Sequence, residues 1–155
     1  MGAMGRIMLA KLLTAYAVTA LIFGALDAIW LRFASPALYR PALGDLLADK
    51  FRVGPAIAFY VIYVAAITYF AVFPGLLSAD AGNASFFAGP RLAVVHGAIV
   101  GLVCYATYDL TNQATLKNWP VHVTLIDLAW GTAATALATG LSTLVMIRFF
   151  GGLAG

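Results

Sequence analysis

The sequence has no glutamate and little charge of either sign. Its six acidic residues are all aspartates, nine residues are Lys or Arg, and charged residues make up 10% of the 155 positions. Soluble domains usually carry about 25% charged residues, because a surface that faces water needs them. Hydrophobic residues make up 63% of the chain. The surplus apolar surface is therefore expected to face lipid.

Residues that carry common chemistries are also scarce. One cysteine excludes an internal disulfide, and Cys104 lies in an apolar run, where it is expected to pack as a small hydrophobe. The two histidines occur without HxxxH or ExxH spacing, so no metal site is predicted, and the lack of glutamate argues against a di-iron carboxylate bundle. No cofactor can be named. The basic residues stand at the ends of apolar runs, which is typical of membrane anchoring and not of nucleic-acid binding.

Four apolar segments are long enough to cross a membrane as helices, which takes about 20 residues each. The predicted spans are residues 8–33, 53–73, 90–110 and 121–147. Ser35-Pro36 is expected to end the first span and Pro74-Gly75 the second, because proline cannot continue the helical hydrogen bonds. The first span is longer than a signal-peptide core and contains Asp27, so we interpret it as a retained helix.

The predicted fold is therefore an all-α membrane protein, with residues 1–155 forming one domain. We expect an up-down bundle of four transmembrane helices, with a short interfacial segment between the first two. Residues 36–52 favour such a segment because their leucines recur at roughly helical spacing among charged residues; a plain loop is the alternative. Residues 75–89 are rich in Gly, Ala, Ser, Asp and Asn, which predicts a loop, and Asn83-Ala84-Ser85 within them matches the short glycosylation pattern.

Three aspartates fall within or near the ends of the predicted spans. A charge in the hydrocarbon core costs several kcal/mol unless it faces a partner or a cavity. Asp27 lies near the end of the first span, Asp109 at the end of the third and Asp127 about two turns into the fourth. In an up-down bundle these positions share one layer near one membrane face. The predicted polar pocket comprises Asp27, Trp30, Tyr60, Tyr63, Tyr105, Tyr108, Asp109, Asn112, Lys117, Asp127 and Trp130.

This layer has a functional and a structural interpretation. As a pocket, it could bind a cation, relay a proton or hold the polar head of a ligand. In the structural interpretation, the aspartates cap helices or pair with Lys117, Arg32 or Arg52, while Tyr and Trp form an interfacial belt. Gly97 and Gly101 form a GxxxG pair, which favours close helix packing either within the bundle or in a homodimer.

Four segments carry a resemblance to a known family. Residues 105–120 read YATYDLTNQATLKNWP and residues 127–131 read DLAWG, while residues 26–31 read LDAIWL and residues 59–63 read FYVIY. Together they resemble DUF2177, a family of predicted bacterial membrane proteins. The resemblance implies a multi-pass protein of the bacterial inner membrane. It implies no catalytic residues, because the family has no established activity, although it suggests a link with fatty-acid modification.

Three functions from different classes follow. The first is binding or transport of a small polar molecule, ion or lipid headgroup at the aspartate layer. The second is a membrane-embedded enzyme or accessory protein in lipid modification, with a pocket open to acyl chains. The third is a packing subunit of a larger membrane complex. Partners are expected to be the lipid bilayer and, in an oligomer or complex, other membrane chains; nucleic acid is excluded. The Lys and Arg residues divide almost equally between the two sides, so they do not fix the orientation.

Overall fold

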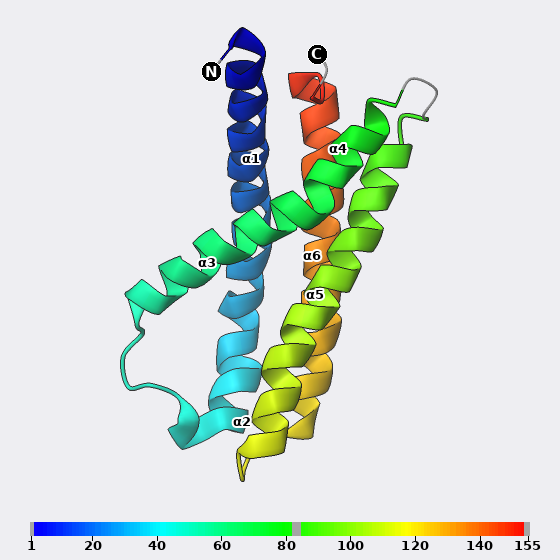
Figure 1. The fold of residues 1–155 in the computed structure, drawn as a ribbon. Helices are drawn as coiled ribbons and strands as arrows, with labels where there is room; N and C mark the ends of the chain where they lie inside the picture. Colours follow the sequence, from blue (N-terminus) through cyan, green and yellow to red (C-terminus); the bar gives the residue numbers. More distant parts are fainter. Residues whose placement is uncertain (1, 82–84, 154–155) are drawn as a thin grey trace.

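The structure, a computed structural model, describes residues 2–81 and 85–153. Four helical stretches are long and apolar enough to cross a membrane: Met4–Leu43, Val53–Ala79, Ala88–Thr115 and Val121–Phe150. The predicted all-α fold with four spans is therefore confirmed. Both chain ends lie at the same end of the molecule (Figure 1), as an even number of spans requires. Asn83 and Ala84 of the glycosylation pattern lie outside the described residues.

The first span does not end at Pro36. It consists of α1 (Ala3–Ala34), a π-helical turn η1 (Ser35–Tyr39) and α2 (Arg40–Leu43), and a 3₁₀ turn η2 (Gly44–Leu46) follows it. In η1 the Arg40 N–H donates to the Ser35 carbonyl oxygen, five residues earlier. This wider turn accommodates Pro36, which has no N–H. The predicted helix end at Ser35-Pro36 is therefore wrong. The helical path ends instead near Gly44, whose φ of 46° lies in the left-handed region that glycine tolerates.

The connector after the first span is helical over its first part. Helical turns continue α1 over residues 35–43, a separate 3₁₀ turn covers residues 44–46, and residues 47–52 carry no helix. A single amphipathic helix over 36–52 therefore does not form. The position of these turns relative to a lipid surface stays a prediction.

The second span also passes through its proline. It consists of α3 (Val53–Ile67), a π-helical turn η3 (Thr68–Val72) and α4 (Phe73–Ala79). Pro74 has no N–H to donate to the Phe70 carbonyl oxygen four residues earlier, and His96 Nδ1 lies 3.1 Å from that oxygen. His96 thus has a structural partner at this turn. The predicted loop at 75–89 is wrong over residues 75–79, which belong to α4, and over residues 88–89, which begin the next helix.

The third and fourth spans pack tightly against each other. They are α5 (Ala88–Thr115) and α6 (Val121–Phe150), which also extend past their predicted ends. A Cβ on Gly101 would lie 2.3 Å from the Gly131 carbonyl oxygen, and one on Gly131 would lie 2.2 Å from the Tyr105 ring. Such close approach requires glycine. The GxxxG pair therefore packs within the chain, where Thr139 Oγ1 also donates to the Ala93 carbonyl oxygen at 2.8 Å.

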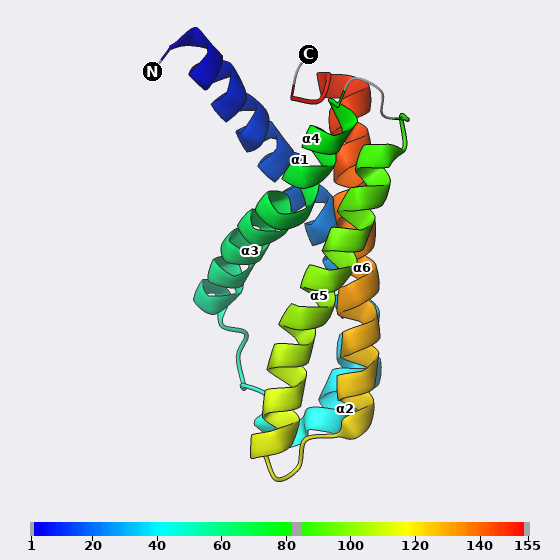
Figure 2. The same cartoon turned by 45° about the vertical axis from the view of Figure 1, so that its right-hand side comes forward.

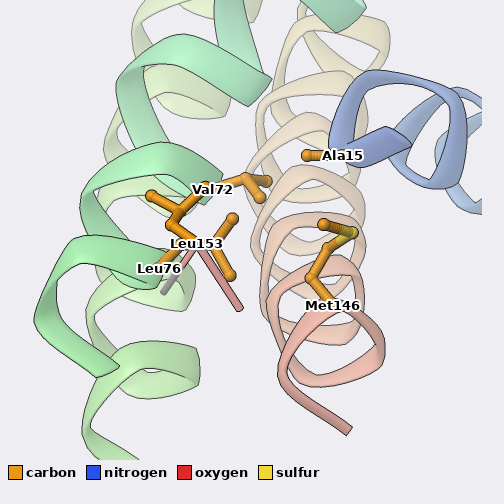
Figure 3. Close-up of a cluster of buried hydrophobic side chains, with 5 residues drawn as sticks. All are labelled: Ala15, Val72, Leu76, Met146 and Leu153. Atoms are coloured by element: carbon orange, nitrogen blue, oxygen red, sulfur yellow. The ribbon is translucent and has the colours of Figure 1, made fainter. Parts of the chain in front are cut away.

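Two apolar clusters fill the bundle between the chain ends and its middle. Figure 3 shows the first cluster, near the chain ends, where the side chains converge from α1, the second span, α6 and the C-terminal turn; it comprises Ala15, Val72, Leu76, Met146 and Leu153. The second cluster comprises Phe23, Tyr63, Val64, Ile67 and Ala138. Many large apolar side chains remain exposed, such as Leu21 at 75% and Ile62 at 68%. In a membrane these side chains face lipid.

The second span is not parallel to the other three. Figures 1 and 2 show α3 and α4 running obliquely across α1, α5 and α6, so that the start of α3 stands away from them. At the opposite end from the chain termini lie the end of α1, the end of α5 and the start of α6. The connector that joins α2 to α3 lies at this same end of the bundle.

Candidate functional site

A cavity of about 970 Å³ lies in this region. Its walls come from α1, the connector that follows α1, the start of α3, the end of α5, the α5–α6 turn and the start of α6. Seven of the eleven residues in the predicted pocket line it: Asp27, Trp30, Tyr60, Tyr105, Tyr108, Asp127 and Trp130. These residues come from four spans, so the fold brings together side chains that are far apart in the sequence. Whether the cavity binds a ligand stays a prediction.

Two of the predicted aspartates face the cavity as buried carboxylates. Asp27 on α1 is 7% exposed, and the Tyr60 hydroxyl on α3 donates to its Oδ2. Asp127 on α6 is 6% exposed, and the Tyr39 hydroxyl in η1 donates to its Oδ1 at 2.5 Å. Each tyrosine hydroxyl therefore donates to only one of the two oxygens of its aspartate. A carboxylate has further acceptor capacity, so both can also accept hydrogen bonds from a ligand.

Aromatic rings form much of the cavity wall. Trp30 on α1 and Trp130 on α6 stack with ring centroids 4.4 Å apart. Trp30 Nε1 also donates to the Tyr39 hydroxyl oxygen at 3.0 Å. Trp119 Nε1 donates to Thr124 Oγ1 at 3.0 Å, which fixes the α5–α6 turn against α6. The three tryptophans of the chain all line the cavity.

The opening carries charge of mainly positive sign. Arg40, Lys50 and Arg52 line the cavity, together with Asp49. All four side chains are exposed. The cavity therefore has an acidic inner part at Asp27 and Asp127 and a largely basic outer part.

Four predicted pocket residues do not line the cavity. Tyr63 lies deeper, where its hydroxyl is 2.7 Å from Thr135 Oγ1. Asn112 is half-buried and Lys117 is exposed, and neither contributes to the wall. Lys117 is the expected counter-charge for one aspartate, but Asp27 and Asp127 accept hydrogen bonds from tyrosine hydroxyls instead.

The fourth, Asp109, is fully buried behind the cavity. Its exposed fraction is 0%, and neither carboxylate oxygen has a hydrogen-bond partner among the described residues. Gln113 Oε1 and Trp130 Nε1 are two further buried polar atoms without a partner within that part of the chain. Asp109 thus differs from Asp27 and Asp127 in that it does not line the cavity, although it belongs to the same end of the bundle.

Sequence reasoning missed Tyr39 as a site residue. Trp30 and Tyr39 are nine residues apart, which in a regular α-helix is two and a half turns and places them on opposite faces. The π-helical turn at Ser35–Tyr39 and the change of direction after it bring the Tyr39 hydroxyl back to Trp30 and Asp127. Pro36 was the available signal, but it predicted an end to the helix and not a wider turn.

Comparison with known proteins places these features in a family. The family described as "Predicted membrane protein (DUF2177)" matches residues 12–144 of the 155. The matched region contains every residue that lines the cavity. No curated protein and no solved structure matches the chain. Among the described residues, no group of three or more His, Cys, Asp or Glu side chains is placed to hold a metal ion.

Proposed function

The chain belongs to the DUF2177 family of predicted membrane proteins, and we propose that it binds, in the cavity, a ligand whose head carries a positively charged ammonium group. The observation that carries this proposal is the pair of buried carboxylates, Asp27 and Asp127, which face one cavity from two different helices. Both accept hydrogen bonds from tyrosines and not from Lys or Arg within the described residues. Their negative charges therefore remain for a cation to neutralise.

The aromatic wall supports the same ligand class. An ammonium or quaternary ammonium group is attracted to the faces of Trp and Tyr rings, most strongly where water is excluded. Tyr60, Tyr105 and Trp130 line the cavity beside the two aspartates. An anionic head would face two like charges at this depth. The inner cavity thus favours a cation over an anion or a neutral polar group.

Binding fits the fold better than passage through it. The two apolar clusters fill the bundle between the cavity and the chain termini, and their members Phe23, Ile67 and Leu76 are fully buried. We therefore infer a binding protein that receives its ligand from one membrane surface or from the lipid beside α3. We expect it to reside in the bacterial inner membrane.

Tryptophan fluorescence tests the proposal directly, because Trp30, Trp119 and Trp130 are the three tryptophans of the chain and all line the cavity. The purified protein in detergent is titrated with choline, and with 3,3-dimethylbutan-1-ol, which has the same shape without the charge. We expect choline to change the emission in a saturable way and the alcohol to have little effect. Equal responses to both probes would refute the proposed cation site.

Two variants assign the response to the aspartates. Asp27→Asn and Asp127→Asn keep the side-chain shape and each remove one charge, so each is expected to weaken choline binding about tenfold or more. Asp80→Asn is the matched control, because Asp80 lies at the far end of the second span and accepts from the Leu153 N–H. Unchanged choline affinity in both cavity variants would also refute the assignment.

The same head chemistry occurs on soluble molecules and on lipids. The cavity is bordered by apolar side chains such as Leu31, Leu43 and Leu47, which favours a ligand that carries an acyl chain. The protein in nanodiscs of phosphatidylcholine is therefore compared with the protein in nanodiscs of phosphatidylglycerol. If a lipid head occupies the cavity, phosphatidylcholine raises the apparent Kd of choline; equal Kd values assign the site to a soluble ligand.

A further inference from the structure

Asp109 is the buried acidic group that the proposed ligand site does not use. It lies on α5, is 0% exposed, and has no hydrogen-bond partner among the described residues at either carboxylate oxygen. A bare carboxylate buried away from water is so unfavourable that the group normally takes up a proton instead. The position of Asp109 therefore requires an occupant that supplies positive charge or a hydrogen-bond donor.

The register of α5 and α6 places Asp109 opposite Asp127. Close contacts pair Gly97 with Thr139, and Tyr105 with Gly131, along the two antiparallel helices. One turn further along, four residues after Tyr105 and four before Gly131, the facing positions are Asp109 and Asp127. Two facing carboxyl groups in a low-dielectric site cannot both be ionised without a large cost. One member of the pair must therefore be neutral.

The surroundings of the two carboxyl groups decide which one is neutral. Asp127 accepts a hydrogen bond from the Tyr39 hydroxyl and lines the cavity, so its charge has a donor and an open side. Within residues 2–81 and 85–153, Asp109 has neither a donor nor a place in the cavity wall. One turn after it on the same face of α5, Gln113 Oε1 is a second buried acceptor to which no described residue donates. A proton on Asp109 supplies the donor that this group of acceptors lacks.

We propose that Asp109 is a proton-binding site, paired across the α5–α6 contact with Asp127, and that it holds its proton at neutral pH. The proton occupies one Asp109 oxygen and is released to water when the group ionises. The charge on the cavity-facing Asp127 is thereby linked to the protonation state of Asp109. This gives the bundle a second, proton-specific site that is distinct from the ligand cavity.

The other titratable groups at this end of the bundle are exposed or lie around the cavity. On α6, His122 is exposed beyond the paired positions, and Lys117 is exposed in the turn between α5 and α6. Tyr105 and Tyr108 share α5 with Asp109, while Asp27 and Tyr39 approach from α1 and η1 across the cavity. Asp127 is therefore the acidic group that faces Asp109 directly.

Infrared spectroscopy tests the proposal, because protonated carboxylic acids absorb separately from carboxylates. The chain contains six acidic residues and no glutamate, so ¹³C-aspartate labelling identifies any such band as aspartate. In the purified protein at neutral pH we expect a carboxylic acid band that Asp109→Asn removes and Asp27→Asn leaves in place. Absence of the band in the wild type, or its persistence in Asp109→Asn, would overturn the proposal.

A second variant tests the pairing. Asp127→Asn removes the facing negative charge, so Asp109 ionises more readily and its acid band disappears at a lower pH. The midpoint is expected to fall by about one to two pH units, as for a like charge a few ångströms away in a protein site. An unchanged midpoint would overturn the pairing. If Asp109→Asn does not fold, the band is assigned by comparing titrations of the wild type, Asp27→Asn and Asp127→Asn. Only Asp127→Asn is expected to lower the pH at which the acid band disappears. Neither infrared measurement uses a ligand. Both therefore test the proton site even if choline does not bind.

Discussion

Trp30 and Trp130 stack across the contact between α1 and α6, with ring centroids 4.4 Å apart and ring planes 9° apart. The same Trp30 ring donates to the Tyr39 hydroxyl, which in turn donates to Asp127. Ring stacking and two hydrogen bonds thus join the first span, its π-helical turn and the fourth span in one wall of the cavity. The position of the Asp127 carboxylate depends on this wall.

Replacing Tyr39 with Phe tests that dependence. Tyr39→Phe removes the donor to Asp127 and the acceptor for Trp30 Nε1, so two partly buried polar groups lose a partner. We expect the free energy of unfolding to fall by about 1–3 kcal/mol, measured as a lower thermal midpoint in detergent. Tyr69→Phe is the matched control, because Tyr69 is 66% exposed and its hydroxyl is expected to contribute little. Equal effects of the two changes would contradict the role of Tyr39.

His96 is predicted to stabilise the turn at Pro74. His96→Leu removes the side-chain donor from the Phe70 carbonyl oxygen, which Pro74 cannot replace because it has no N–H. We expect a loss of about 1–3 kcal/mol in the free energy of unfolding, again measured as a lower thermal midpoint. This explanation requires that the cost depend on Pro74.

A double-mutant cycle supplies that control. Pro74→Ala restores a backbone N–H that can donate to the Phe70 carbonyl, so His96→Leu should cost less in the Pro74→Ala background than in the wild type. If the two costs are equal, His96 acts through packing and not through the freed carbonyl.

Close packing of α5 on α6 leads to a prediction at Gly101. An added Cβ would lie 2.3 Å from the Gly131 carbonyl oxygen, which is backbone and cannot move aside alone. Gly101→Ala is therefore expected to destabilise the protein by about 1–3 kcal/mol, as overpacked cores do. Gly24→Ala in α1 is the control, because no described atom outside the adjoining backbone lies within 4 Å of the point that an added Cβ would occupy, and alanine favours helix. A thermal midpoint that is unchanged by Gly101→Ala would contradict the predicted α5–α6 contact.

The fold was largely predictable because hydrophobic run length is a strong signal. Four runs of sufficient length predicted four spans, and the structure has them. The ends of the first two spans were not predictable from Pro36 and Pro74. Each proline marks a place where a helix usually ends, but π-helical turns at Ser35–Tyr39 and Thr68–Val72 carry both helices onward. Whether a turn widens depends on tertiary partners such as His96, which sequence spacing does not reveal.

The aspartate layer was predictable in position and not in role. Counting residues along the predicted spans places Asp27 and Asp127 at one end of the bundle, and both line the cavity. The same counting places Asp109 beside them, yet Asp109 is fully buried and does not line the cavity. Depth along a helix follows from counting residues, whereas the direction of a side chain around the helix depends on packing angles. The hydroxyl donors of Tyr39 and Tyr60 likewise come from the geometry of the first connector and the oblique second span.

The basic opening of the cavity predicts a preference for ligands that also carry phosphate. Arg40, Lys50 and Arg52 line the outer part of the cavity, and the acidic inner part is the proposed ammonium site. Phosphocholine is therefore expected to bind more tightly than choline in the tryptophan fluorescence titration. Lys50→Gln combined with Arg52→Gln should abolish this difference and leave choline affinity nearly unchanged. If phosphocholine binds more weakly than choline in the wild type, the outer cations do not contact the ligand.

Choline binding is finally predicted to release a proton. A cation placed beside Asp127 lowers the cost of ionising the facing Asp109, so the ligand favours the deprotonated form and a proton leaves to water. In a weakly buffered solution at neutral pH, a pH indicator should therefore report acidification when choline is added to the wild type.

By the same linkage, choline should bind more tightly as the pH rises, because fewer proteins then hold the competing proton. Asp109→Asn should still bind choline, as judged by tryptophan fluorescence, but release no proton and lose the pH dependence. Proton release that persists in Asp109→Asn would assign the exchange to another group, most directly Asp127 itself.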